Sequence, residues 1–100
     1  MEKNHIQITP GICGGKPHIS GHRIRVQDIV IWHEKMGLSA DEILLHFPSL
    51  TFSDIYAALT YYFDHKEQID NDIREEEKFS ESFLKRHPSK LKSKLKEAYV

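Results

Sequence analysis

The sequence of 100 residues has little of what covalent cross-links, membrane spans and secretion require. Cys13 is its sole cysteine, so the chain has no intramolecular disulfide framework. No apolar run approaches the length of a membrane span, and the first residues contain no stretch typical of a signal peptide. We therefore expect a cytoplasmic protein in a reducing compartment.

An excess of one charge is also lacking, since the formal net charge is -1 although 29% of the residues are charged. This balance excludes a bulk attraction to nucleic acid or to a membrane surface. The charges are nevertheless unevenly distributed, because residues 85–100 carry six Lys or Arg against Glu97 alone. Basic tails of this kind usually bind acidic partners.

Catalytic and metal-binding patterns are missing as well. Residues 11–17 resemble a P-loop superficially, but the glycines are one residue too close, and Pro17 replaces the Ser or Thr that would bind magnesium. No serine lies in a nucleophile-elbow pattern. No second cysteine completes a zinc signature with the candidate ligands, which are Cys13, His18, His22 and His5. We therefore expect a protein that is not an enzyme and binds no metal or cofactor.

The first quarter of the chain has the pattern of short strands and turns. Residues 1–13 predict a strand followed by a turn at Pro10-Gly11. Residues 14–26 predict a β-hairpin whose strands, 18–20 and 24–26, flank Gly21. Its outward side chains include three cations, Lys16, Arg23 and Arg25.

From Val26 onward the apolar residues follow helical spacing, and two helices are indicated before Pro48. Gly37 is placed to end the first helix, whose apolar face contains Val26, Ile29, Val30, Ile31, Trp32, His33 and Met36. Ser39 and Glu42 fit a capping box at the start of the second. That helix is expected to bury Ile43, Leu44 and Phe47.

A third helix begins after Thr51, with Asp54 near the positive end of its macrodipole. Its predicted apolar stripe consists of Phe52, Ile55, Tyr56, Leu59, Tyr62 and Phe63. We therefore predict a mainly α fold: a trihelical, helix-turn-helix-like (homeodomain-like) core with a short N-terminal β-hairpin and a helical C-terminal arm. Residues 1–65 form the core domain in this interpretation, and residues 66–100 form the charged helical extension.

Residues 14–26 read Gly-Gly-Lys-Pro-His-Ile-Ser-Gly-His-Arg-Ile-Arg-Val, and this run resembles the GGKPxIxGTRIxV signature of the bacterial domain-of-unknown-function family 433. His22 stands where that signature has Thr. The segments 37–44, 47–51 and 55–62 are similar to the rest of the family pattern, in order. The resemblance implies a homeodomain-like core and a VapB-like antitoxin, often encoded beside a PIN-like protein, which is a metal-dependent ribonuclease.

Two surfaces are candidates for partner binding. The predicted third helix has no Lys or Arg outside its apolar stripe, so DNA contact is expected instead at Lys16, Arg23 and Arg25. Inhibition of a PIN-like toxin is expected at the C-terminal arm, where basic and aromatic residues alternate. The residues assigned to it are Arg74, Phe79, Phe83, Leu84, Lys85 and Arg86.

The predicted function is thus an antitoxin that binds and inhibits a PIN-like ribonuclease and also represses its own operon, acting as a homodimer. Two alternatives remain open at this stage. One is a DNA-binding transcriptional regulator without a toxin partner, and the other is a general protein-interaction module built on the same helices.

Overall fold

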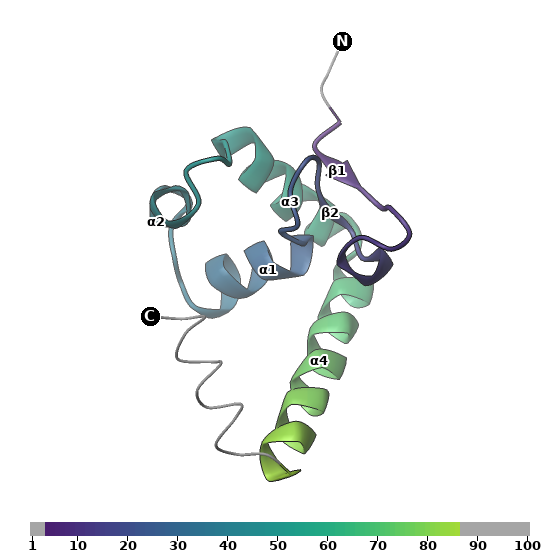
Figure 1. Cartoon of the computed structure of the whole chain (residues 1–100). Coiled ribbons are helices and arrows are strands. Elements are labelled where there is room, and N and C mark those ends of the chain that lie inside the picture. Colours follow the sequence, from purple (N-terminus) through teal and green to yellow (C-terminus); the bar gives the residue numbers. More distant parts are fainter. Residues whose placement is uncertain (1–3, 87–100) are drawn as a thin grey trace. The chain divides into compact units, whose positions relative to one another are not determined.

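The computed structural model describes residues 4–86, with residues 84–86 described by their backbone alone. The chain divides into two compact units, Met1–Ile69 and Asp70–Val100. The first unit contains a small antiparallel sheet and helices α1 to α3, and helix α4 (Lys66–Arg86) starts in it and continues into the second (Figure 1). The fold of the described residues is therefore mainly helical with a minor sheet, as the sequence predicts.

The sheet pairs strands that are distant in the sequence. Strand β1 (Ile6–Gln7) is antiparallel to β2 (His18–Ile19), with Ile6 opposite Ile19. The predicted hairpin about Gly21 is present but short: the Ile19 amide donates to the Ile24 carbonyl oxygen at 2.9 Å, and His18 and Arg25 form an isolated antiparallel bridge, but residues 24–26 form no regular strand. The reason is local competition: Val26 already belongs to helix α1 (Val26–Val30), so few residues are left for a strand.

Helix α1 continues directly into a π-helical turn, η2 (Ile31–Lys35). The Met36 amide donates to the carbonyl oxygen of Ile31 at 2.9 Å, five residues earlier. A π turn holds one residue more than an α turn, so residues after it are rotated relative to α-helical spacing. This rotation explains why Met36 is 51% exposed, although the sequence placed it on the apolar face. Gly37, with φ of 75°, ends the turn as predicted.

Capping boxes start the next two helices. At α2 (Ala40–His46), the Glu42 amide donates to Ser39 Oγ and the Ser39 amide to Glu42 Oε1, both at 3.1 Å. At α3 (Phe52–Asp64), Thr51 and Asp54 exchange the same two bonds at 3.0 and 3.1 Å. Each box satisfies amides that a helix N-terminus leaves without an intrahelical acceptor. The predicted start of α2 is confirmed, and so is that of α3.

The core of the first unit forms where α1 packs against α3, and α3 also contacts β1, β2 and α2 (Figure 1). The rings of Trp32 and Phe47 stack with centroids 4.6 Å apart and thereby join η2 to the end of α2. The buried apolar residues of this unit include Ile19, Val26, Ile29, Val30, Ala40, Ile43, Leu50, Ile55, Ala58, Leu59 and Tyr62.

The predicted stripe of α3 is only half buried. Ile55, Leu59 and Tyr62 lie in the core, whereas Phe52, Tyr56 and Phe63 are 46%, 56% and 60% exposed. The prediction is wrong for these three aromatic residues, because the apolar arc of the helix is wider than α1, α2 and the sheet can cover. Among residues 4–86, no helix is long and apolar enough to span a membrane.

Candidate functional site

The connection between β1 and β2 turns through left-handed backbone conformations. Cys13, Gly14 and Gly15 (η1, Cys13–Gly15) have φ values of 53°, 62° and 76°. This conformation is costly for Cys13, which has a Cβ atom. The turn is closed by the Lys16 amide, which donates to the carbonyl oxygen of Cys13 at 3.1 Å. It thereby fixes the backbone from which the Lys16 side chain projects.

A second turn, at Gly21, positions Arg23. The His22 amide donates to the carbonyl oxygen of Ile19 at 3.0 Å. The Cys13 thiol in turn donates to the carbonyl oxygen of Arg23 at 3.3 Å. This contact joins the two turns across ten residues of sequence, so the thiol has a structural role.

The third cation, Arg25, is oriented by Asp28 in the first turn of α1. The Arg25 guanidinium donates through Nη2 to Asp28 Oδ1 at 2.7 Å and through Nε to Asp28 Oδ2 at 3.1 Å. The Arg25 amide also donates to Asp28 Oδ2, at 2.9 Å. Such a two-pronged pair fixes the plane of the guanidinium and offsets part of its charge.

These three cations meet in one cleft. A solvent-open depression of about 430 Å³ is lined by Cys13, Gly14, Lys16, Arg23 and Arg25. The structure thus gathers all three residues that the sequence assigned to DNA contact. Lys and Arg side chains converging on one cleft are suited to bind a phosphate or another anion by charge-assisted hydrogen bonds. None of these five lining residues is a carboxylate or a histidine that could serve there as a general base.

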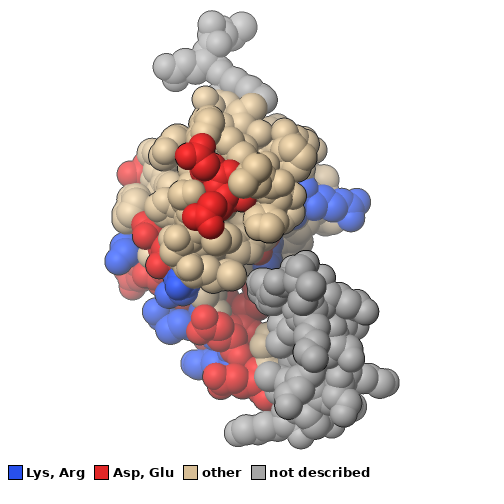
Figure 2. All heavy atoms as spheres, turned by 90° about the vertical axis from the view of Figure 1, so that its left-hand side faces the viewer, with Lys and Arg blue, Asp and Glu red and all other residues tan. Residues whose placement is uncertain are grey.

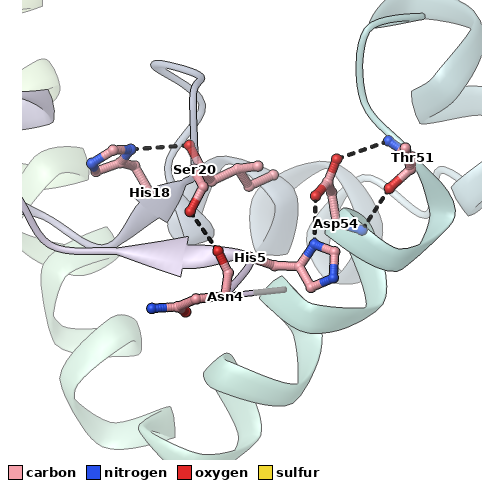
Figure 3. Close-up of polar contacts among 7 residues, drawn as sticks. Asn4, His5, His18, Ser20, Thr51 and Asp54 are labelled. Atoms are coloured by element: carbon pink, nitrogen blue, oxygen red, sulfur yellow. Dashed lines mark hydrogen bonds and ion pairs between the residues drawn. The ribbon is translucent and has the colours of Figure 1, made fainter. Parts of the chain in front are cut away.

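Polar contacts hold the N-terminal segment against α3 and against the residue that follows β2 (Figure 3). His5 Nδ1 and the buried carboxylate of Asp54 lie 2.8 Å apart, and Ser20 Oγ donates to the carbonyl oxygen of Asn4 at 2.7 Å. The sequence identified Asp54 as a helix-start residue but not its pairing with His5. The two residues are 49 positions apart, and no local pattern links them.

Three of the four candidate metal ligands each bind a different group of the protein, and the four do not meet at one point. His18 Nδ1 is within 3.1 Å of the carbonyl oxygens of Ile19 and His22, so this nitrogen carries the proton and donates. His5 binds Asp54, and Cys13 binds the Arg23 carbonyl. Among the described residues, no group of three His, Cys, Asp or Glu side chains is placed to hold a metal ion.

The predicted toxin-binding residues belong to α4, in the second unit. Arg74 is exposed, Phe79 is 70% exposed, and Phe83 is half-buried with its ring centroid 6.3 Å from that of Phe79. Leu84, Lys85 and Arg86 belong to the α4 backbone, but their side chains lie outside the described residues. The structure therefore brings Phe79 and Phe83 together on α4, apart in sequence from the basic cleft.

Comparison with known proteins gives two matches. Residues 6–62 match the family described as "Protein of unknown function (DUF433)". The fold is similar to the crystal structure of a DUF433 member protein from Anabaena variabilis, with 43% sequence identity and a TM-score of 0.68. This similarity covers 72% of the present chain and 70% of the Anabaena chain. No curated protein matches the sequence.

Proposed function

Since the chain belongs to the DUF433 family, we propose that it is the antitoxin of a bacterial toxin–antitoxin pair and inhibits a PIN-like ribonuclease. Helices α1 to α3 serve in this proposal as a homeodomain-like, helix-turn-helix-like scaffold. Helix α4 and the residues that follow it form the inhibitory arm. The chain acts by covering or contacting other macromolecules and not by catalysis.

The observation that carries this proposal is the surface of α4. Phe79 is 70% exposed on a helix that is otherwise strongly charged. From Asp70 to Glu81, both included, the helix has six Asp or Glu residues and two basic residues, Arg74 and Lys78. A ribonuclease attracts the phosphates of RNA with cations around its active site, and an acidic helix can occupy the same surface. Arg74 can then reach the carboxylates that hold the catalytic metal ions, while Phe79 supplies an apolar anchor.

Coexpression with the PIN-like protein encoded beside this chain tests the proposal. We expect the two proteins to copurify and the ribonuclease to be inhibited, and both effects to disappear when residues 74–100 are deleted. Changing Arg74 and Phe79 together to Ala should weaken inhibition at least about tenfold, because anchor residues dominate interface energies. Lys78→Ala is the matched control on the same helix. Full inhibition by the truncated chain would exclude α4 as the inhibitory arm.

A second candidate function, binding of operator DNA, is favoured by the basic cleft. Lys16, Arg23 and Arg25 converge there, while helix α3 carries no Lys or Arg. On the face where α2 lies, acidic side chains group within a wide uncharged surface (Figure 2). Because phosphate contacts supply much of the affinity for DNA, the cleft is better suited to this role than α2 or α3.

Salt dependence distinguishes DNA binding through the cleft from nonspecific association. Binding to a duplex from the chain's own promoter should weaken with salt. The slope of log K against log salt should fall by about 2 when Arg23 and Arg25 are both changed to Ala. Lys35→Ala, an exposed lysine at the end of η2, is the matched control and should change the slope by less. A slope that the double variant leaves unchanged would exclude the cleft.

A further inference from the structure

An aromatic stripe on α3 remains uncovered by the rest of the first unit. Phe52, Tyr56 and Phe63 are 46%, 56% and 60% exposed. At 3.6 residues per turn, these three positions lie within roughly 40° of one another around the helix axis. Ile55 and Leu59, which the core buries, border the stripe on one side. The apolar arc of α3 therefore continues past the core into solvent.

The stripe has the chemistry of a protein contact surface. The rings of Phe52 and Tyr56 stack with their centroids 6.5 Å apart, and Tyr56 adds a hydroxyl that can remain hydrated at an interface rim. The helix carries no Lys or Arg, and the exposed residues beside the stripe include Ser53, Thr60 and Asp64. Uncharged aromatic surface next to a core is typical of the centre of a protein–protein interface.

We infer that the stripe binds the same stripe on a second copy of this chain, with the two α3 helices antiparallel. A two-fold interface must be complementary to itself. Aromatic residues stand at both ends of the stripe, so antiparallel pairing places Phe52 of one copy against Phe63 of the other. Tyr56 of each copy then lies near the two-fold axis.

Charge selects the antiparallel arrangement. Asp64 is exposed at the C-terminal end of α3, where the helix macrodipole is already negative. Antiparallel pairing keeps the two Asp64 carboxylates at opposite ends of the contact and opposes the two helix macrodipoles. Parallel pairing would instead bring the two Asp64 carboxylates together and align the macrodipoles unfavourably.

The exposed area of the stripe limits how much surface two copies can bury. With about 200 Å² for each aromatic side chain, the exposed fractions leave roughly 300 Å² of surface on each copy. A standard interface buries about 800 Å² per partner, so the stripe supplies its centre but not all of it. We therefore expect weak association that depends on the protein concentration.

Sedimentation of the full chain between about 1 µM and about 1 mM tests the dimer. We expect the mass to rise from one chain to two, and Tyr56→Arg or Phe63→Arg to raise the dissociation constant at least about tenfold. Leu45→Arg is the matched control, since it makes the same kind of change at an apolar residue of α2 that is 82% exposed. Circular dichroism of each variant checks that the helices remain. A chain that is monomeric throughout, or a dimer insensitive to both α3 variants, would overturn the inference.

Cysteine cross-linking tests the orientation in a Cys13→Ser background. A chain with Phe52→Cys mixed with a chain with Phe63→Cys should form a disulfide-linked pair faster than either chain alone. Parallel pairing predicts the opposite, because each chain would then cross-link with itself. A monomeric chain that binds the PIN-like ribonuclease through Tyr56 and Phe63 would also overturn the inference and assign the stripe to that partner.

Discussion

Helices α3 and α4 use amphipathic sequences in different ways. In helix α3, Ile55 and Leu59 are buried in the core of the first unit, whereas the aromatic stripe is exposed at the surface. Helix α4 is rich in charged residues, and among its described side chains the most exposed large apolar one is Phe79, at 70%. Residues on the inner face of α3 therefore stabilise the fold, whereas Phe79 lies largely in solvent. The difference teaches that helical periodicity alone does not distinguish a core residue from a contact residue.

The largest effect on stability is expected at the inner face of α3. Ile55 is fully buried, and Ile55→Ala leaves a cavity in a core that can relax only in part. We expect the free energy of unfolding to fall by about 3 kcal/mol. Urea denaturation followed by circular dichroism measures this change, and a loss below about 1 kcal/mol would contradict the assigned burial.

An intermediate effect is expected at the start of α3. Asp54→Ala removes the carboxylate that accepts from the Thr51 amide and leaves His5 without its carboxylate partner. The free energy of unfolding should fall by about 2 kcal/mol, since a cap and a buried polar contact are lost together. A double-mutant cycle with His5→Ala measures the pair itself, and strictly additive losses would show that the two side chains do not interact.

A smaller effect on stability is expected at the start of α2. Its capping residues, Ser39 and Glu42, bond to each other, whereas Asp54 also binds the distant His5. Ser39→Ala removes the acceptor of the Glu42 amide and should cost about 1 kcal/mol of unfolding free energy. Ser53→Ala, at an exposed position of α3, is the matched serine control. Equal losses in the two variants, again from urea denaturation, would argue against a specific capping contribution.

The smallest effect on stability is expected on α4. Phe79→Ala removes a large apolar side chain, but one that is 70% exposed. The unfolding free energy should change by less than about 0.5 kcal/mol, as for most surface substitutions. A loss of more than about 1 kcal/mol would place Phe79 in the fold of its own unit and remove the contrast with α3.

Local patterns predicted the helices well, because their signals lie within a few residues. The Ser39–Glu42 box and the Gly37 stop are examples, and both are present. The exposure of Met36 was not predictable, since the π turn before it changes the helical register without an evident local cause. The pairing of β1 with β2 was not predicted for another reason: it joins residues 11 and 13 positions apart, and no local pattern specifies the partner of a two-residue strand.

The site was predictable in its residues but not in its shape. The sequence identified Lys16, Arg23 and Arg25 as outward cations of one segment. Their convergence on a single cleft depends on the left-handed turn at Cys13–Gly15 and on the bidentate contact from Asp28. The exposure of Phe52 and Phe63 likewise depends on how much of α3 its neighbours cover, which periodicity does not measure.

The hydrogen bond from the Cys13 thiol to the Arg23 carbonyl oxygen makes the reactivity of this thiol a measure of the state of the cleft. Because the chain has no second thiol, a chromophoric alkylating reagent would label this one atom and no other. Labelling requires the thiol to leave the Arg23 carbonyl oxygen, so the reaction rate reports how often this contact opens. A ligand seated among the neighbouring cations would slow that rate, which allows occupancy to be followed without altering the bound molecule.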